Sequence, residues 1–85
     1  MYDYTICSEA YEALFHLQCA ALEKHIPGLQ EVELLEDVDE SKLHIYRKDG
    51  KKLVVYNDYE VGAVYIKSEF DLTPYFPHAK ISPYV

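Results

Sequence analysis

The sequence predicts an α+β fold, in which one N-terminal helix packs on an antiparallel meander of three or four strands. Apolar residues recur at helical spacing over about residues 9–26, and after Gly28 the hydrophobic period falls to two residues, as in strands. Three of the four prolines lie within residues 68–85, where they disfavour regular structure. We expect residues 1–85 to form a single domain, because a chain of this length supplies one hydrophobic core.

The predicted helix, about residues 9–26, has chemical signals at both ends. Ser8 can cap the first turn by accepting a hydrogen bond from an otherwise unpaired amide. Acidic residues follow in the first turn and Lys24 lies in the last turn, as the helix dipole favours. Pro27 then prevents the helix from continuing, and Gly28 allows the chain to turn.

The faces of this helix leave two interpretations open. An ordinary surface helix is polar over about half of its circumference. Here the coherent polar stripe is narrower and consists of Glu9, Glu12, His16 and Glu23. Either a curved sheet cradles the helix, or the helix also packs against a second subunit or a partner.

The strands are expected at about residues 30–36, 42–48, 51–57 and 60–67. Asp49-Gly50, between the second and third of these segments, predicts a tight hairpin. Gly62, inside the fourth, indicates a bulge or a close backbone approach.

The C-terminal segment, residues 68–85, is expected to be irregular. Its apolar side chains include Phe70, Leu72, Tyr75 and Phe76, which are too hydrophobic for a free tail. We therefore expect this segment to lie strapped over the domain, with at most one helical turn.

Charge is unevenly distributed along the chain, whose net charge is −7. Residues 1–40 carry −9, and residues 41–85 carry +2. Two cysteines are too few for the disulfide framework of a small secreted domain, so both are expected to be reduced. The first four residues include no basic side chain, and no apolar run reaches the roughly 20 residues of a membrane span. We expect a cytoplasmic location without membrane association.

No arrangement in the sequence predicts catalysis, a cofactor or a metal centre. His16 and Cys19 are three residues apart on the helix, but a second short ligand pair of the kind zinc requires is missing. Asp37 and Asp39 alternate as in a calcium loop, which would also need a central glycine. Three scattered glycines cannot form a phosphate-binding loop. The chain is therefore not expected to be an enzyme.

Residues 31–40 contain six acidic side chains and no basic one. The expected strand places Val32 and Leu34 on one face and Glu31 and Glu33 on the other. A charged run can simply protect a sheet edge from aggregation. It can also imitate the phosphates of a nucleic acid and attract a basic protein surface. Both interpretations stay open.

Nine of the 85 residues are tyrosines, a type enriched in protein interfaces. The alternation predicts that Leu43 and Ile45 face the helix, and that Tyr46 and Tyr56 face away from it. Such tyrosines could bind a partner or could stabilise the sheet by cross-strand pairing. The residues that we expect to bind a partner are Glu31, Glu33, Glu36, Asp37, Asp39, Glu40, Tyr46 and Tyr56.

Direct nucleic-acid binding would depend on the hairpin cations Arg47, Lys48, Lys51 and Lys52. The negative charge of the chain as a whole opposes approach to a polyanion, so no direct binding is expected.

In size, acidity, tyrosine content and lack of a catalytic motif, the chain resembles the small proteins with which phages block host defence, among which anti-CRISPR proteins are the best known. The resemblance is one of general character. It implies an inhibitor that occludes a basic, nucleic-acid-binding surface of a larger protein in the host cytoplasm. The alternative is a non-enzymatic accessory subunit that forms a homo-oligomer, such as a homodimer, through its helix.

Overall fold

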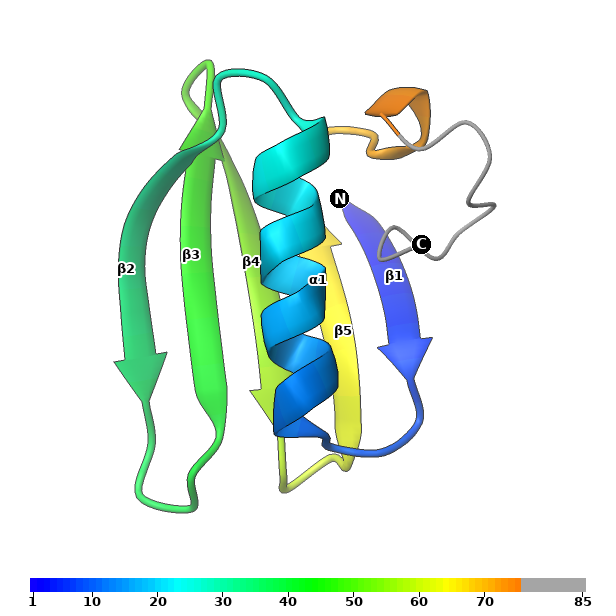
Figure 1. The fold of residues 1–85 in the computed structure, drawn as a ribbon, viewed down its shortest axis with the longest axis vertical. Coiled ribbons are helices and arrows are strands. Elements are labelled where there is room, and N and C mark those ends of the chain that lie inside the picture. Colours follow the sequence, from blue (N-terminus) through cyan, green and yellow to red (C-terminus); the bar gives the residue numbers. More distant parts are fainter. Residues whose placement is uncertain (76–85) are drawn as a thin grey trace.

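The computed structural model describes residues 1–75 and confirms an α+β fold, with one α-helix on a five-stranded antiparallel sheet (Figure 1). The elements in chain order are β1 (Tyr2–Cys7), α1 (Glu12–His25), β2 (Gln30–Glu36), β3 (Lys42–Lys48), β4 (Lys51–Asp58), β5 (Ala63–Ser68) and a 3-10 turn, η1 (Thr73–Tyr75). The sheet order is β1-β5-β4-β3-β2, so β1 and β2 form its two edges. The helix lies across one face of the sheet (Figure 1), and no other helix within residues 1–75 covers the opposite face, which we call the open face.

The expectation of three or four strands was wrong by one, because β1 precedes the helix. Tyr4 is buried on the helix side of the sheet, and a bulge between Thr5 and Cys7 interrupts the alternation at the end of the strand. β1 pairs antiparallel with β5, more than 60 residues away in sequence, so that Tyr4 lies opposite Ile66. A pairing over that separation leaves no local signal in the sequence.

The helix begins at Glu12, three residues later than predicted. Tyr11 occupies the N-cap position without a side-chain cap, and its backbone N–H instead donates to Asn57 Oδ1 at 3.0 Å. The predicted Ser8 cap is therefore wrong, because β1 and a short connection use the residues before position 12. The C-terminal end agrees with the prediction, and Gly28 adopts a φ of 78° just beyond it.

The β3–β4 hairpin is confirmed. Asp49 and Gly50 both have positive φ, 51° and 77°, as a two-residue type I′ turn requires. Gly62 also has a positive φ, 77°, but it lies in the turn before β5. The prediction of a bulge or a close backbone approach within a strand starting at residue 60 was wrong, since β5 begins at Ala63 and nothing in residues 1–75 lies within 4 Å of where a Cβ of residue 62 would be.

The predicted orientation of β3 was also wrong. The two-residue hairpin turn sets Tyr46 opposite Leu53, so both face the helix, and Tyr46 is fully buried. Leu43 and Ile45 point to the open face instead, where Leu43 lies opposite Tyr56. The orientation predicted for Tyr56, away from the helix, agrees with the structure.

The hydrophobic core lies between α1 and the sheet. The helix contributes Phe15 and Leu22, which are fully buried, while the strands contribute side chains such as Val55 and Ile66. Leu72 is 1% exposed and joins this cluster, and Phe70 and Tyr75 pack against it. The expectation of an irregular segment strapped over the domain is thus confirmed for residues 70–75, with one 3-10 turn. Phe76 and the rest of that prediction lie outside the described residues.

Only one side of α1 is covered by the rest of residues 1–75. Phe15, Gln18, Cys19 and Leu22 are its buried residues. On the outer side Leu17 is 62% exposed, and Ala13 and Ala20 are exposed as well. No helix within these 75 residues is long and apolar enough to cross a membrane.

Candidate functional site

The acidic run lies on the edge strand β2 and on the turn that follows it. All seven residues of β2 are exposed, and within the described chain β3 is its only neighbour in the sheet. Apolar side chains are interspersed with the acids, and Val32, Leu34 and Leu35 are 52%, 49% and 40% exposed. An exposed, partly apolar edge of this kind is able to pair with another chain.

A β-bulge at Val32 changes the orientation of the acids along β2. Glu31 lies opposite Tyr46 on the helix side, and Glu33 lies opposite Ile45 on the open side. The prediction that Glu31 and Glu33 share a face was therefore wrong, because the bulge leaves Val32 unpaired and shifts the alternation by one residue. Glu36, opposite Lys42, is on the helix side.

The turn after β2 is fixed by its own hydrogen bonds. The backbone N–H of Asp37 donates to Ser41 O at 2.8 Å, and that of Glu40 donates to Asp37 O at 3.1 Å. Asp39 Oδ1 accepts from the Ser41 N–H at 3.0 Å. Glu40 takes a positive φ of 70° and is exposed. The turn thus holds Asp37 and Asp39 in set positions.

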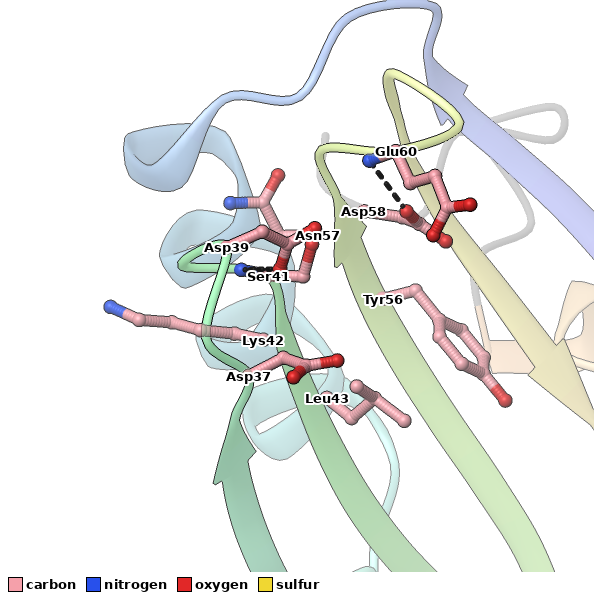
Figure 2. A pocket seen from close by; sticks show the side chains of 9 residues that line it. All are labelled: Asp37, Asp39, Ser41, Lys42, Leu43, Tyr56, Asn57, Asp58 and Glu60. Atoms are coloured by element: carbon pink, nitrogen blue, oxygen red, sulfur yellow. Dashed lines mark hydrogen bonds between the residues drawn. The ribbon is translucent and has the colours of Figure 1, made fainter.

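Asp37 and Asp39 line a pocket of about 140 Å³ at one end of the sheet (Figure 2). The same pocket is lined by Asp58, the last residue of β4, and by Glu60 in the turn between β4 and β5. Four carboxylates at two separate turns therefore surround one hollow. The remaining lining residues are Ser41, Lys42, Leu43, Tyr56 and Asn57.

Asp58 and Glu60 were missed in the sequence, although a signal was present. In an antiparallel meander, alternate turns lie at the same end of the sheet. The turn after 30–36 and the turn after 51–57 must then be neighbours, and both are acidic.

Asp58 organises the second turn as an ionised carboxylate. Its Oδ1 accepts from the backbone N–H groups of Glu60 and Val61 at 3.0 and 3.1 Å, and its Oδ2 accepts from the Tyr65 hydroxyl at 3.0 Å. These hydrogen bonds, led by the one from Val61, lower the pKa of Asp58. The pocket therefore contains at least one carboxylate that keeps its negative charge in mild acid.

The two turns are joined directly. Ser41 is buried, and its Oγ accepts a hydrogen bond from the backbone N–H of Tyr59 at 2.9 Å. Because each turn is also closed internally, this bond fixes the separation between the two pairs of acidic residues.

Within residues 1–75, Lys42 is the single basic residue that lines the pocket, but its ammonium does not neutralise the four carboxylates. The side chain extends to Glu12 on α1 and forms an ion pair there. In Figure 2 it points away from Tyr56 and Asp58. The pocket thus keeps a surplus of negative charge.

An aromatic and apolar surface adjoins the acids. Tyr56 stacks on Tyr65 with ring centroids 4.6 Å apart. Cross-strand pairing continues from Tyr56 to Leu43 and on to Leu35 at the edge of the open face. Of the two predicted tyrosine anchors, the structure brings Tyr56 to the pocket. Tyr46 cannot act as an anchor, because it is fully buried beneath α1.

His16 and Cys19, the helical pair considered as metal ligands, point in different directions. His16 is exposed and lies 3.7 Å from Glu12, whereas Cys19 is buried. The eight predicted partner-binding residues therefore divide between sites. Asp37, Asp39 and Tyr56 line the pocket, and Glu40 lies in the turn beside Asp39. Glu33 is on the open face of β2, whereas Glu31, Glu36 and Tyr46 are on the helix side of the sheet.

No protein-family model, curated protein or solved structure matches this chain.

Proposed function

We propose that this chain is a small protein-binding inhibitor that occludes a basic surface of a larger protein, with the acidic pocket and the edge strand β2 as its contact surface. The observation that carries the proposal is the convergence of Asp37, Asp39, Asp58 and Glu60 on one pocket beside an exposed strand. Like charges held together by a rigid scaffold repel one another, and a cationic partner relieves that repulsion.

The size of the pocket favours a protein side chain as its occupant. Its volume is about 140 Å³, whereas small-molecule sites usually enclose about 300–1,000 Å³. A lysine or arginine of the partner would enter between the carboxylates and meet the ring of Tyr56. Such a contact combines charge pairing with a cation–π interaction.

The charge around the pocket supports a nucleic-acid-binding protein as the target. Glu33 on the open face, Glu36 on the helix side and Glu40 in the turn add further exposed negative charge to β2 and its turn. A row of carboxylates presents charge much as a phosphate chain does, and long-range attraction would speed encounter with a basic groove. Inhibition of this type is the strategy expected of a phage anti-defence protein.

The test is affinity capture from the native host lysate with matched variants. In the triple variant D37N/D39N/E60Q, the asparagines can keep the turn hydrogen bonds that Asp37 Oδ1 and Asp39 Oδ1 accept. The control D3N/E9Q/D49N removes the same charge from exposed residues that do not line the pocket. The captured protein is then purified, and its affinity for each variant is measured by calorimetry at low and high salt.

The proposal expects the control to bind like the wild type and the pocket variant to lose several kcal/mol, because close interfacial charge pairs contribute roughly 2–5 kcal/mol each. The partner should also release the inhibitor when heparin or DNA competes for its basic surface. Equal affinity of both triple variants would refute the proposal, as would a complex that is insensitive to salt and to polyanions.

Direct nucleic-acid binding is the first competing explanation. Lys48 is used within the fold, where it donates to Pro27 O and lies 3.8 Å from Asp49. We expect the isolated protein to cause no electrophoretic mobility shift of DNA or RNA at about 100 mM salt. At this ionic strength, charge interactions over less than about 10 Å are not fully screened, so direct binding would still be detected. A shift that disappears when Arg47, Lys48, Lys51 and Lys52 are changed to Ser would reverse this ranking.

A homo-oligomeric accessory subunit is the second candidate, and the exposure of Leu17 favours it. This leucine is 62% exposed between the small residues Ala13 and Ala20, so a second helix could approach closely. Sedimentation equilibrium of the wild type and Leu17→Glu separates the two candidates. A dimer that becomes a monomer in L17E supports the subunit, and a monomeric wild type supports the inhibitor.

A further inference from the structure

A second polar cluster lies on the other side of the sheet, between α1 and the edge strand. Three side chains meet there from three elements: Glu23 from α1, Glu31 from β2 and His44 from β3. One potential ligand atom of each lies within 4.8 Å of the others. The bulge at Val32 is what turns Glu31 toward this side.

Tyr46 fixes which nitrogen of His44 carries the hydrogen. The Tyr46 hydroxyl lies 2.6 Å from Glu23 Oε2 and donates its one proton to that carboxylate. The 2.6 Å separation is that of a strong hydrogen bond to a carboxylate, which has no proton of its own to give. His44 Nδ1 lies 3.0 Å from the same oxygen and must therefore be the donor to it.

The consequence is an unusual contact at the other ring nitrogen. In the neutral imidazole, His44 Nε2 carries a lone pair, and it lies 3.3 Å from Glu31 Oε2, which also carries lone pairs. The pair is within ion-pairing distance but is not aligned as a hydrogen bond. His44 is only 8% exposed, and Nε2 is buried without a hydrogen-bond partner among residues 1–75. Two electron-pair donors face each other at a site that a cation would satisfy.

We propose that Glu23, Glu31 and His44 bind a divalent transition-metal ion, with zinc as the best fit. His44 would coordinate through Nε2, and Glu23 and Glu31 would each supply one carboxylate oxygen. Bonds of about 2.0–2.2 Å from one zinc ion place tetrahedral ligand atoms about 3.3–3.6 Å apart. The present distances reach that arrangement with small side-chain movements.

The surrounding groups match those that support metal ligands in proteins. A ligating histidine usually donates its second N–H to a fixed acceptor, which sets the tautomer and the ring orientation. Tyr46 is that acceptor, and its ring stacks on His44 with centroids 4.3 Å apart. The same hydroxyl holds Oε2 of Glu23, which leaves Oε1 available to the ion.

The chemistry of the donors selects among metals. One imidazole nitrogen suits zinc, cobalt or nickel, whereas calcium and magnesium prefer oxygen-only sites. Glu23 and Glu31 are exposed, so an ion can enter from solvent, and a water can complete the coordination. Bound metal would tie the edge strand β2 to α1 and β3.

Calorimetric titration with ZnCl₂ tests the site, with Glu31→Gln as the main variant and Glu33→Gln as its matched control. Both variants remove one charge from β2, but Glu33 is on the open face. The expected result is one zinc site in the wild type and in E33Q, and a zinc affinity that is weaker by about 10-fold or more in E31Q. Mutation of a residue that only supports a ligand already lowers metal affinity by about 10–100-fold. Zinc should also raise the melting temperature of the wild type more than that of E31Q.

Two further measurements distinguish this site from the acidic pocket. Cobalt(II) bound at this site should give a visible absorption band. In Tyr46→Phe, about 10-fold more cobalt should be needed to reach half of the maximal absorbance, because Tyr46 supports two ligands without touching the ion. The D37N/D39N/E60Q variant should bind zinc like the wild type. Zinc binding that survives E31Q but disappears in the triple variant would overturn the proposal, as would no zinc binding in folded wild type.

Discussion

The Oγ of Ser41 accepts a hydrogen bond from the Tyr59 N–H at 2.9 Å, and this bond joins the two turns whose carboxylates form the acidic pocket. It crosses from the β2–β3 turn to the β4–β5 turn, which are 18 residues apart in sequence. The geometry of the proposed binding surface therefore depends on one buried hydroxyl.

Ser41→Ala should loosen this junction. The Tyr59 N–H would lose its acceptor, which costs about 1–2 kcal/mol in the free energy of unfolding, as urea denaturation can measure. Amide hydrogen exchange of Tyr59 should accelerate as well. Ser8→Ala is the control, because Ser8 is exposed and has no hydrogen bond to its side chain within residues 1–75. Identical exchange at Tyr59 in both variants would contradict the role given to Ser41.

Gln18→Met is expected to stabilise the protein. Gln18 is fully buried in α1, and neither its Oε1 nor its Nε2 has a partner in the described part of the chain. Methionine has a similar shape and removes an unpaired buried amide, which typically costs about 1–3 kcal/mol. The free energy of unfolding should therefore rise by about 1 kcal/mol or more.

The control for this change is Gln30→Met, the same substitution at an exposed position of β2. It should leave stability nearly unchanged. A loss of stability in Q18M would show that the amide of Gln18 is satisfied by a group beyond residues 1–75 or by buried water.

The two cysteines should differ sharply in reactivity. Cys19 is buried, and desolvation, reinforced by the charge of Glu23, raises its pKa to about 12. The thiolate is the reactive form, so Cys19 should resist alkylation by iodoacetamide at pH 8 until the protein unfolds. Cys7 is only half-buried and should react first.

Mass spectrometry of the native wild type and of Cys7→Ser measures this difference. C7S should show almost no labelling without denaturant and complete labelling with it. Rapid labelling of native C7S would mean that Cys19 is accessible, in conflict with its place in the core.

Acid should remove the stability that Asp58 contributes. The Val61 and Glu60 amides and the Tyr65 hydroxyl lower its folded pKa below the ordinary value. The folded state then binds this proton less readily than the unfolded state does. The contribution is fully present above the unfolded pKa, near 4, and is lost as pH falls through the lower folded value.

Thermal denaturation of the wild type and Asp58→Asn at several pH values checks this sign. The wild type should be the more stable at pH 7, and the difference should shrink as the pH falls from about 5 to below the folded pKa. A difference that is constant with pH would show that ionised Asp58 is not what holds the turn.

Local patterns in the sequence were sufficient for the central part of the fold. The alternation of residues 30–36 and 42–48 predicts β2 and β3 with the bounds that the structure has. Asp49-Gly50 predicts the hairpin that joins β3 to β4. β1 was missed although its six residues also alternate, because its pairing with β5 depends on the sheet order.

The error in β3 arose where hydrophobicity and register disagree. Leu43 and Ile45 are more apolar than His44 and Tyr46, so the pattern favoured the wrong face. A two-residue turn at Asp49-Gly50 fixes the register of the hairpin and places Tyr46 opposite Leu53. This register would have predicted that Tyr46, and not Ile45, faces the helix. His44 and Tyr46 can face the helix because Glu23 and His44 form hydrogen bonds with the Tyr46 hydroxyl. The sequence contains no pattern from which these hydrogen bonds could be predicted.

The acidic site was predicted in part for a similar reason. Clustering along the chain identified Asp37 and Asp39, whereas Asp58 and Glu60 join them only through the sheet.

The bulge at Val32 makes the two surfaces of β2 separable in evolution. Glu31, just before it, belongs to the cluster on the helix side, whereas Glu33, just after it, belongs to the open face. Val32 has no partner in the β3 ladder, so losing it would leave every pairing on either side in place. Substitutions in one half of the strand therefore need not disturb the other, and one short edge can acquire two specialisations without a compromise between them.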